Sequence, residues 1–180
     1  MPRTWLVLAL ALAPGFAQRT GPGQADLLAI ESSFDNKLKR TFDDIPFLLL
    51  DRTNGTYIDG FGAVFTSTVN LVMTPNLNPF KQEVSAEDKL RFQQAKVKKL
   101  PQLRQLMTDF LVSSAGAMDK LPPEESIVLS VKLFYQPWEL HQGLPERVMV
   151  SGQKRRLVDL ATQRVGRAQL DTIVKTRELY

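Results

Sequence analysis

Cysteine is absent from the 180-residue sequence, and its absence excludes several kinds of chemistry. Disulfides, thiolate catalysis, iron–sulfur clusters and cysteine-bound zinc all require this residue. The folded chain must therefore be stabilised by the packing of its apolar side chains. We also expect no bacterial lipid anchor, because such an anchor is attached to a cysteine that follows the signal segment.

Histidine is nearly absent, since His141 is the only one in the sequence. A zinc site usually recruits two or three histidines, and a Ser-His-Asp triad would have to use this residue. We therefore predict no metal site and no cofactor. The net charge of +4 is a mild excess without a nucleic-acid-binding motif, so no nucleic-acid partner is expected.

Long hydrophobic runs are also lacking, because the one apolar run, Trp5–Ala13, is shorter than the roughly 20 residues of a membrane span. Arg3 precedes this run, and Gly15 and Ala17 follow it as the small residues of a cleavage site. This order predicts a signal peptide over 1–17, with cleavage near Ala17 and no transmembrane segment in the mature chain. We expect a secreted or periplasmic protein, and the lack of disulfides favours a bacterial one. A buried N-terminal helix is the alternative.

The remainder of the chain has the composition of a folded domain. Residues 18–24 are rich in glycine and polar residues, and they predict a flexible N-terminal tail. The whole chain is 43% apolar and 23% charged, which predicts a single domain over 25–180. Hydrophobic periodicity predicts helices over 26–40, 85–121 and 154–164, and strands over 45–53, 56–72, 126–136 and 147–151. For 173–179 a strand or a helix is expected, and a strand is favoured.

This order of elements predicts an α+β fold. We expect a mainly antiparallel sheet of about four to five strands, with one long helix and shorter helices packed on it. Pro101 lies in the middle of the long helix and is expected to kink or split it. The residues expected in the core are Phe47, Leu49, Phe65, Leu106, Phe110, Leu129, Val131 and Leu133.

Three local signals are specific enough to test. Asn54-Gly55 predicts the type I′ turn of a hairpin, because both residues tolerate positive φ. Gly60-Phe61-Gly62 predicts a bulge within the second strand of that hairpin. Ser85 is expected to cap the long helix, with Asp88 as its third residue.

Basic residues form two short clusters. One cluster is Lys96, Lys98 and Lys99, and the other is 154–156. Solvated helix faces are the simpler interpretation. Contact with an anionic surface or polymer is the functional one, and for it we single out the first cluster as a binding site.

The loop 136–145 contains Trp138 and His141, and loops often carry binding residues. Trp138 and His141 are therefore the second candidate binding site. The alternative is that Trp138 pins the loop to the body of the protein.

Serine and carboxylate chemistry has little support in the sequence. Ser151 and Lys154 have the Ser-x-x-Lys spacing of penicillin-recognising enzymes, but the companion motifs of those enzymes are missing. Ser151 is more simply an N-cap of the following helix. Ser130 and Lys132 point to the same side of a strand, where a polar stripe is the simpler reading. Adjacent carboxylate pairs occur near predicted helix boundaries, where capping explains them.

These observations predict a secreted or periplasmic, non-enzymatic protein that acts by binding. Its partner is expected to be another envelope protein or an anionic surface. The alternative is a small extracytoplasmic hydrolase that uses Ser151 and Lys154 or a pair of carboxylates. Peripheral association with a membrane through the lysines is a third hypothesis.

Overall fold

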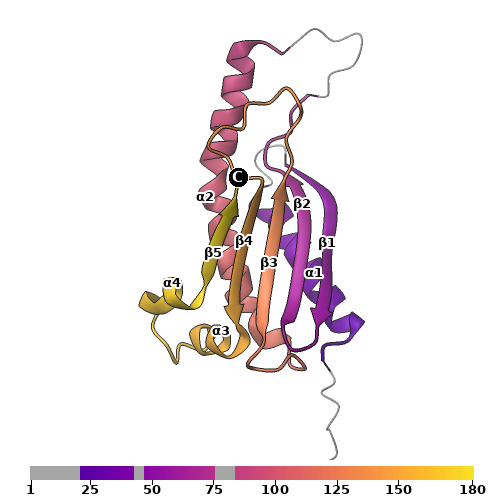
Figure 1. Ribbon diagram of the computed structural model, residues 1–180, viewed down its shortest axis with the longest axis vertical. Helices are drawn as coiled ribbons and strands as arrows, with labels where there is room; N and C mark the ends of the chain where they lie inside the picture. The colour runs from indigo at the N-terminus through magenta and orange to yellow at the C-terminus, as the bar shows by residue number, and fades with distance from the viewer. Residues whose placement is uncertain (1–20, 43–46, 76–83) are drawn as a thin grey trace, which may run out of the picture.

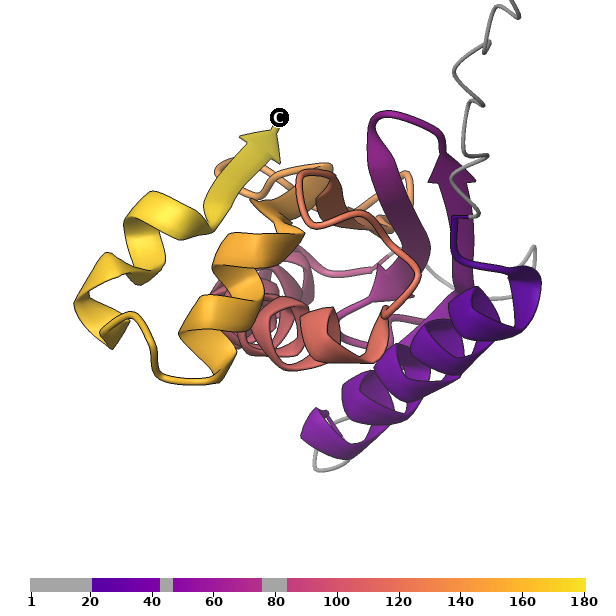
Figure 2. The ribbon, with the colours of Figure 1, turned by 90° about the horizontal axis from the view of Figure 1, so that it is seen from below.

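The computed structural model describes residues 21–42, 47–75 and 84–180 and shows two layers, a sheet and a layer of helices (Figures 1 and 2). The predicted signal peptide, with Arg3 and Ala17, lies outside the described residues. The elements are α1 (Gln24–Thr41), β1 (Leu48–Ile58), β2 (Gly62–Asn70), α2 (Ala86–Ser114), η1 (Ala115–Ala117), β3 (Ser126–Leu133), β4 (Arg147–Gln153), α3 (Lys154–Ala161), η2 (Arg167–Gln169), α4 (Leu170–Ile173) and β5 (Lys175–Leu179).

The five strands form one sheet in the order β1-β2-β3-β4-β5. The pair β2–β3 is parallel, and the other three pairs are antiparallel. The parallel pair arises because α2 connects the two strands as a crossover, whereas short connections join antiparallel neighbours. The α+β class and the mainly antiparallel sheet are therefore confirmed.

The helices α1 and α2 lie on the same face of the sheet, which Figure 2 shows from one end. Alternate residues of β3 point to these helices and are buried, including Leu129 and Val131. Of the eight predicted core residues, six are buried, whereas Phe47 and Leu49 are only partly buried. None of the described helices combines the length and apolar composition needed to cross a bilayer.

The hairpin does not close at Asn54-Gly55, so that prediction is wrong. Both residues lie inside β1, where Gly55 faces Phe65 of β2. The Gly55 N–H donates to Glu31 Oε1 of α1 over 2.7 Å, and a Cβ at Gly55 would lie only 2.7 Å from Phe65 Cε1. Glycine is present because α1 and Phe65 approach the strand closely, not because a turn requires positive φ.

The turn of the hairpin lies instead at 59–61, so the predicted bulge at Gly60-Phe61-Gly62 is also wrong. Gly60 has φ 76° and Gly62 has φ 133°, and both values favour glycine. A Cβ at Gly62 would lie 1.8 Å from the carbonyl oxygen of Ser126. Gly62 therefore allows the turn and also the close approach of β2 to β3.

The long helix is confirmed as α2, and its predicted cap is confirmed as well. Ser85 Oγ accepts the N–H of Asp88 over 3.1 Å. Pro101 lies inside α2, which continues through it without a break, and a kink there stays a prediction. The first half of α2 extends past the sheet, where the loop between β3 and β4 lies beside it (Figure 1).

The C-terminal elements follow the predicted order. β5 confirms the terminal strand, and α3 confirms the short helix, although it ends at Ala161. Ser151 is not the N-cap of α3, because it lies within β4 and Gln153 occupies the cap position. The strand continues two residues past Ser151, its predicted end, so α3 begins only after Gln153.

Candidate functional site

One face of the sheet, which we call the open face, is turned away from α1 and α2. The strands lie in front of both helices in the view of Figure 1. The open-face residues of β3 alternate with its core residues, so Val128, Ser130 and Lys132 point away from the helices. Within the described part of the chain, no helix covers this face.

Cations gather on the open face across three neighbouring strands. Lys132 of β3 lies directly opposite Arg147 of β4. Arg177 of β5 lies opposite Met149, one open-face row further along β4. Like charges placed directly opposite each other destabilise a sheet, so the Lys132–Arg147 pair is not explained by stability.

Arg147 is oriented by a hydrogen bond within the sheet. Its Nη1 donates to Ser130 Oγ over 3.0 Å, which places the guanidinium over the central strand. Ser130 is buried although it lies on the open face. The predicted pair of Ser130 and Lys132 therefore belongs to this cationic surface, with Ser130 as an acceptor for Arg147.

A shallow trough of about 360 Å³ adjoins these cations. Among the described residues that line it, Asp51 is the only carboxylate, whereas Arg52, Lys132 and Arg147 are positive. Hydroxyl and amide groups complete the lining, with Thr66, Thr68 and Asn54 among the contributing residues. The trough thus combines an excess of positive charge with neutral hydrogen-bonding groups.

The predicted basic cluster on α2 is divided between the surface and the interior. Lys96 is 1% exposed and Lys99 is 4% exposed, whereas Lys98 is exposed. Lys99 Nζ lies 5.2 Å from the ring centroid of Phe42. The three lysines therefore do not form one exposed patch, and a binding role for them stays a prediction.

Lys96 is held in a buried network with Glu139 of the loop between β3 and β4. Its Nζ forms an ion pair with Glu139 Oε2 and donates to the carbonyl oxygen of Phe134 over 3.2 Å. Glu139 Oε1 accepts from Thr74 Oγ1 over 2.7 Å and from the N–H of Gln136 over 3.1 Å. Burial lowers the pKa of Lys96, and the hydrogen bond and charge of Glu139 oppose this effect.

The loop that carries Trp138 and His141 is fixed to α2 by this network. The Trp138 ring packs edge-on against Phe92 of α2, with 5.9 Å between centroids. His141 is exposed and lies against Tyr135, with 5.5 Å between centroids. Burial and the nearby Glu139 and Glu146 raise the pKa of Tyr135. This geometry accounts for Trp138 by packing, and contact with a partner through this loop stays a prediction.

The structure places Ser151 and Lys154 in different surroundings. Ser151 lies on the open face of β4, opposite Lys175 of β5. Lys154 begins α3, and its Nζ donates to the carbonyl oxygens of Asp119 and Leu121 over 3.1 and 2.6 Å. Lys154 is thus engaged with the connection between α2 and β3, and the basic residue facing Ser151 in the sheet is Lys175.

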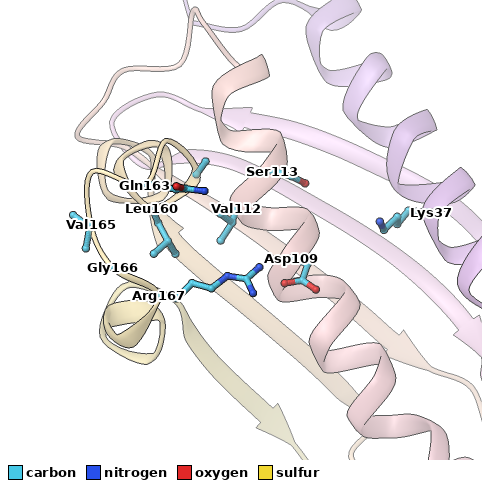
Figure 3. A pocket seen from close by; sticks show the side chains of 10 residues that line it. Lys37, Asp109, Val112, Ser113, Leu160, Gln163, Val165, Gly166 and Arg167 are labelled. Atoms are coloured by element: carbon cyan, nitrogen blue, oxygen red, sulfur yellow. The ribbon is translucent and has the colours of Figure 1, made fainter.

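A groove lies on the helical side of the molecule (Figure 3). It measures about 590 Å³ and lies between α1, α2 and the segment from α3 to η2. Arg167 extends toward Asp109 in Figure 3, and Val112 and Leu160 supply apolar surface. Lys37 lies at the far side, so charges of both signs are present and no class of ligand is singled out.

The cationic open-face residues were not predicted as a site. The alternation in 126–133 and 147–151 would have placed Lys132 and Arg147 on exposed faces, but the pairing of their strands is a tertiary feature. Within the described ranges, no group of three histidine, aspartate or glutamate side chains could hold a metal ion. Comparison of the chain with known protein families, curated proteins and solved structures finds no match.

Proposed function

We propose that the protein is an exported, non-enzymatic binding protein whose open face contacts a linear anionic polymer, such as an acidic polysaccharide. The observation that carries the proposal is the line of Lys132, Arg147 and Arg177 across an uncovered sheet face. Export is supported by the residue order of 1–17.

The spacing of the cations favours a linear polymer. Neighbouring strands are about 4.8 Å apart, so a polymer that crosses β3, β4 and β5 meets one cation on each strand. The trough beside Lys132 adds Thr66, Thr68 and Asn54, whose side chains can hydrogen-bond to sugar hydroxyls. A lipid headgroup layer offers the same charge but does not use such a trough, so vesicles serve as the competing arm of the test.

Polygalacturonate binding by the full chain tests this proposal, with neutral dextran as the reference polymer. The double variant Lys132→Gln/Arg147→Gln should weaken binding at low salt about tenfold, a loss of about 1.4 kcal/mol. Arg40→Gln removes an exposed charge from α1 and is the matched control. Added salt should weaken binding by the unmodified chain as well, because it screens exposed charges.

Two results would contradict the proposal. One is equal affinity for dextran and polygalacturonate, and the other is a loss of affinity in Arg40→Gln that matches the loss in the double variant. Binding to anionic vesicles without binding to polygalacturonate would favour the membrane hypothesis instead. Alanine replacement of Trp138 and His141 tests whether the loop 136–145 contributes.

The alternative, a small hydrolase, has weaker support in the arrangement of the side chains. Lys154 Nζ is occupied by two carbonyl oxygens, whereas a general base must reach the hydroxyl of Ser151. Labelling with a fluorophosphonate or a β-lactam probe tests this alternative. Labelling that disappears in Ser151→Ala would favour the hydrolase over the binding protein.

A further inference from the structure

The junction of β4, α3 and β5 forms a notch that is separate from the trough. The notch measures about 270 Å³ and is lined by Ser126, Ser151, Arg156 and Lys175, among others. These four side chains come from β3, β4, α3 and β5, so the cavity exists only in the folded sheet. We propose that the notch binds a phosphoryl group, either as free phosphate or as a phosphate monoester.

The four side chains share a chemical property, because each is a hydrogen-bond donor without a side-chain partner among the described residues. Two other lining residues are already engaged: Gln153 Nε2 donates to the carbonyl oxygen of Glu124 over 3.0 Å, and Thr172 Oγ1 donates to that of Gln169 over 2.7 Å. The notch therefore keeps two cations and two hydroxyls available, and none of its lining residues is a carboxylate.

Neither cation of the notch takes part in an ion pair among the described residues. Arg156 and Lys175 belong to different elements and line the same small cavity. α3 also begins with three basic residues and has no acidic residue in its first turn. A helix dipole favours negative charge at this end, so a bound anion would relieve both sources of unfavourable electrostatics.

Gly152 shows that the backbone at the notch is closely packed. A Cβ at Gly152 would lie 2.8 Å from Leu157 Cδ2 and 3.2 Å from the carbonyl oxygen of Ile173. Glycine thus allows β4 to pass directly into α3 against the chain that leads to β5. This passage is what brings Ser151 of β4 and Arg156 of α3 to one cavity.

The donor set fits a phosphoryl group better than a carboxylate. A guanidinium presents a planar fork of N–H groups, an ammonium provides a compact charge, and hydroxyls provide two more donors. A carboxylate offers two oxygens in one plane with a single charge. A phosphoryl group offers at least three oxygens in three directions and a charge near −2, which matches the two cations of the notch.

Titration of the full chain with inorganic phosphate, followed by amide NMR, tests the site. At constant ionic strength set with chloride, the amides of 151–153 should shift and saturate. Lys175→Gln and Arg156→Gln should each weaken the apparent affinity about fivefold. Arg155→Gln removes a neighbouring exposed charge that does not line the notch, so it should weaken the apparent affinity less than either notch variant. The spectra also report whether each variant is folded.

Glycerol phosphate and phosphatidate vesicles distinguish the source of the group. Saturation by inorganic phosphate or by glycerol phosphate supports the site, and the tighter of the two identifies a free or an esterified ligand. Three results would overturn the proposed site. They are amide shifts that do not saturate, shifts that persist in Lys175→Gln and Arg156→Gln, and shifts that occur only with vesicles. The double variant Lys132→Gln/Arg147→Gln should keep the phosphate titration, so failure here is distinct from failure of polymer binding.

Discussion

The buried pair of Lys96 and Glu139 is a residue-scale feature with a large energetic consequence. Both side chains are 2% exposed, and their partners come from α2, from the loop between β3 and β4, and from Thr74 after β2. Removing one charge of such a pair leaves the other buried without compensation. The free-energy cost of breaking the pair is therefore larger than the free energy gained by forming it. This cost is what holds the three segments together.

Glu139→Gln should lower the free energy of unfolding by about 3–5 kcal/mol, because Lys96 would remain buried without its counter-charge. Urea denaturation followed by circular dichroism measures this change. The exposed pair of Arg91 and Asp88 provides the control, and Arg91→Gln should cost less than about 1 kcal/mol. Equal losses in the two variants would mean that burial of the pair has no energetic role.

Tyrosine titration gives a second residue-scale prediction. Burial and the neighbouring Glu125 raise the pKa of Tyr57 to about 12. Between the unfolded value of about 10 and this value, the folded chain holds a proton that the unfolded chain has lost. Stability from this group is therefore complete below pH 10 and decreases as the pH rises to 12. A pH titration followed by tyrosinate absorbance measures this. The Tyr57→Phe variant should have one fewer tyrosine that ionises at high pH.

At the scale of elements, α1 is attached to the irregular part of β1 by two carboxylates. Asp35 Oδ1 accepts the Thr53 N–H over 3.0 Å and the Thr53 hydroxyl over 2.6 Å. Glu31, one turn earlier in α1, accepts the Gly55 N–H. The register of β1 shifts between Asp51 and Asn54, so the helix supplies acceptors where the sheet irregularity disturbs the ladder.

Asp35→Ala should destabilise the protein by about 1–3 kcal/mol, because the buried Thr53 N–H and hydroxyl would lose their acceptor. The exposed Asp109→Ala is the control and should change stability by less than about 0.5 kcal/mol. Thermal and urea unfolding of both variants measure the difference. An unchanged midpoint in Asp35→Ala would indicate that water replaces the carboxylate.

The same contacts explain which elements could be predicted. Helical periodicity located α1 and α2, and alternation located β3 and β4, because one side of each element is buried. Asn54-Gly55 has the local chemistry of a turn, which is why a turn is predicted there. The glycine is instead required by other elements, because Phe65 approaches it closely and its N–H donates to Glu31. The site was missed for a related reason, since Lys132 and Arg147 are 15 positions apart and become neighbours only by strand pairing.

At the scale of the whole molecule, the sheet has one face against helices and one face with cations. If the open face had only a structural role, a neutral residue could replace one of the opposed cations without loss of binding. Lys132→Thr should raise the free energy of unfolding by about 0.2–1 kcal/mol, because it removes a like-charge contact and adds a β-branched residue. The same variant should bind polygalacturonate more weakly, and paired urea and binding measurements check both signs. A variant that loses both stability and binding would show that Lys132 is a structural residue.

Composition and periodicity by themselves determined the α+β class, the order of the elements, the absence of thiol chemistry and the expectation of export. These properties follow from residue types and from the spacing of apolar side chains along the chain. Tertiary structure decided the place of the hairpin turn, the burial of Lys96 and Lys99, and the meeting of cations on the open face and in the notch. The physical reason is that strand order, register and close packing depend on contacts between distant segments, which local sequence patterns do not encode.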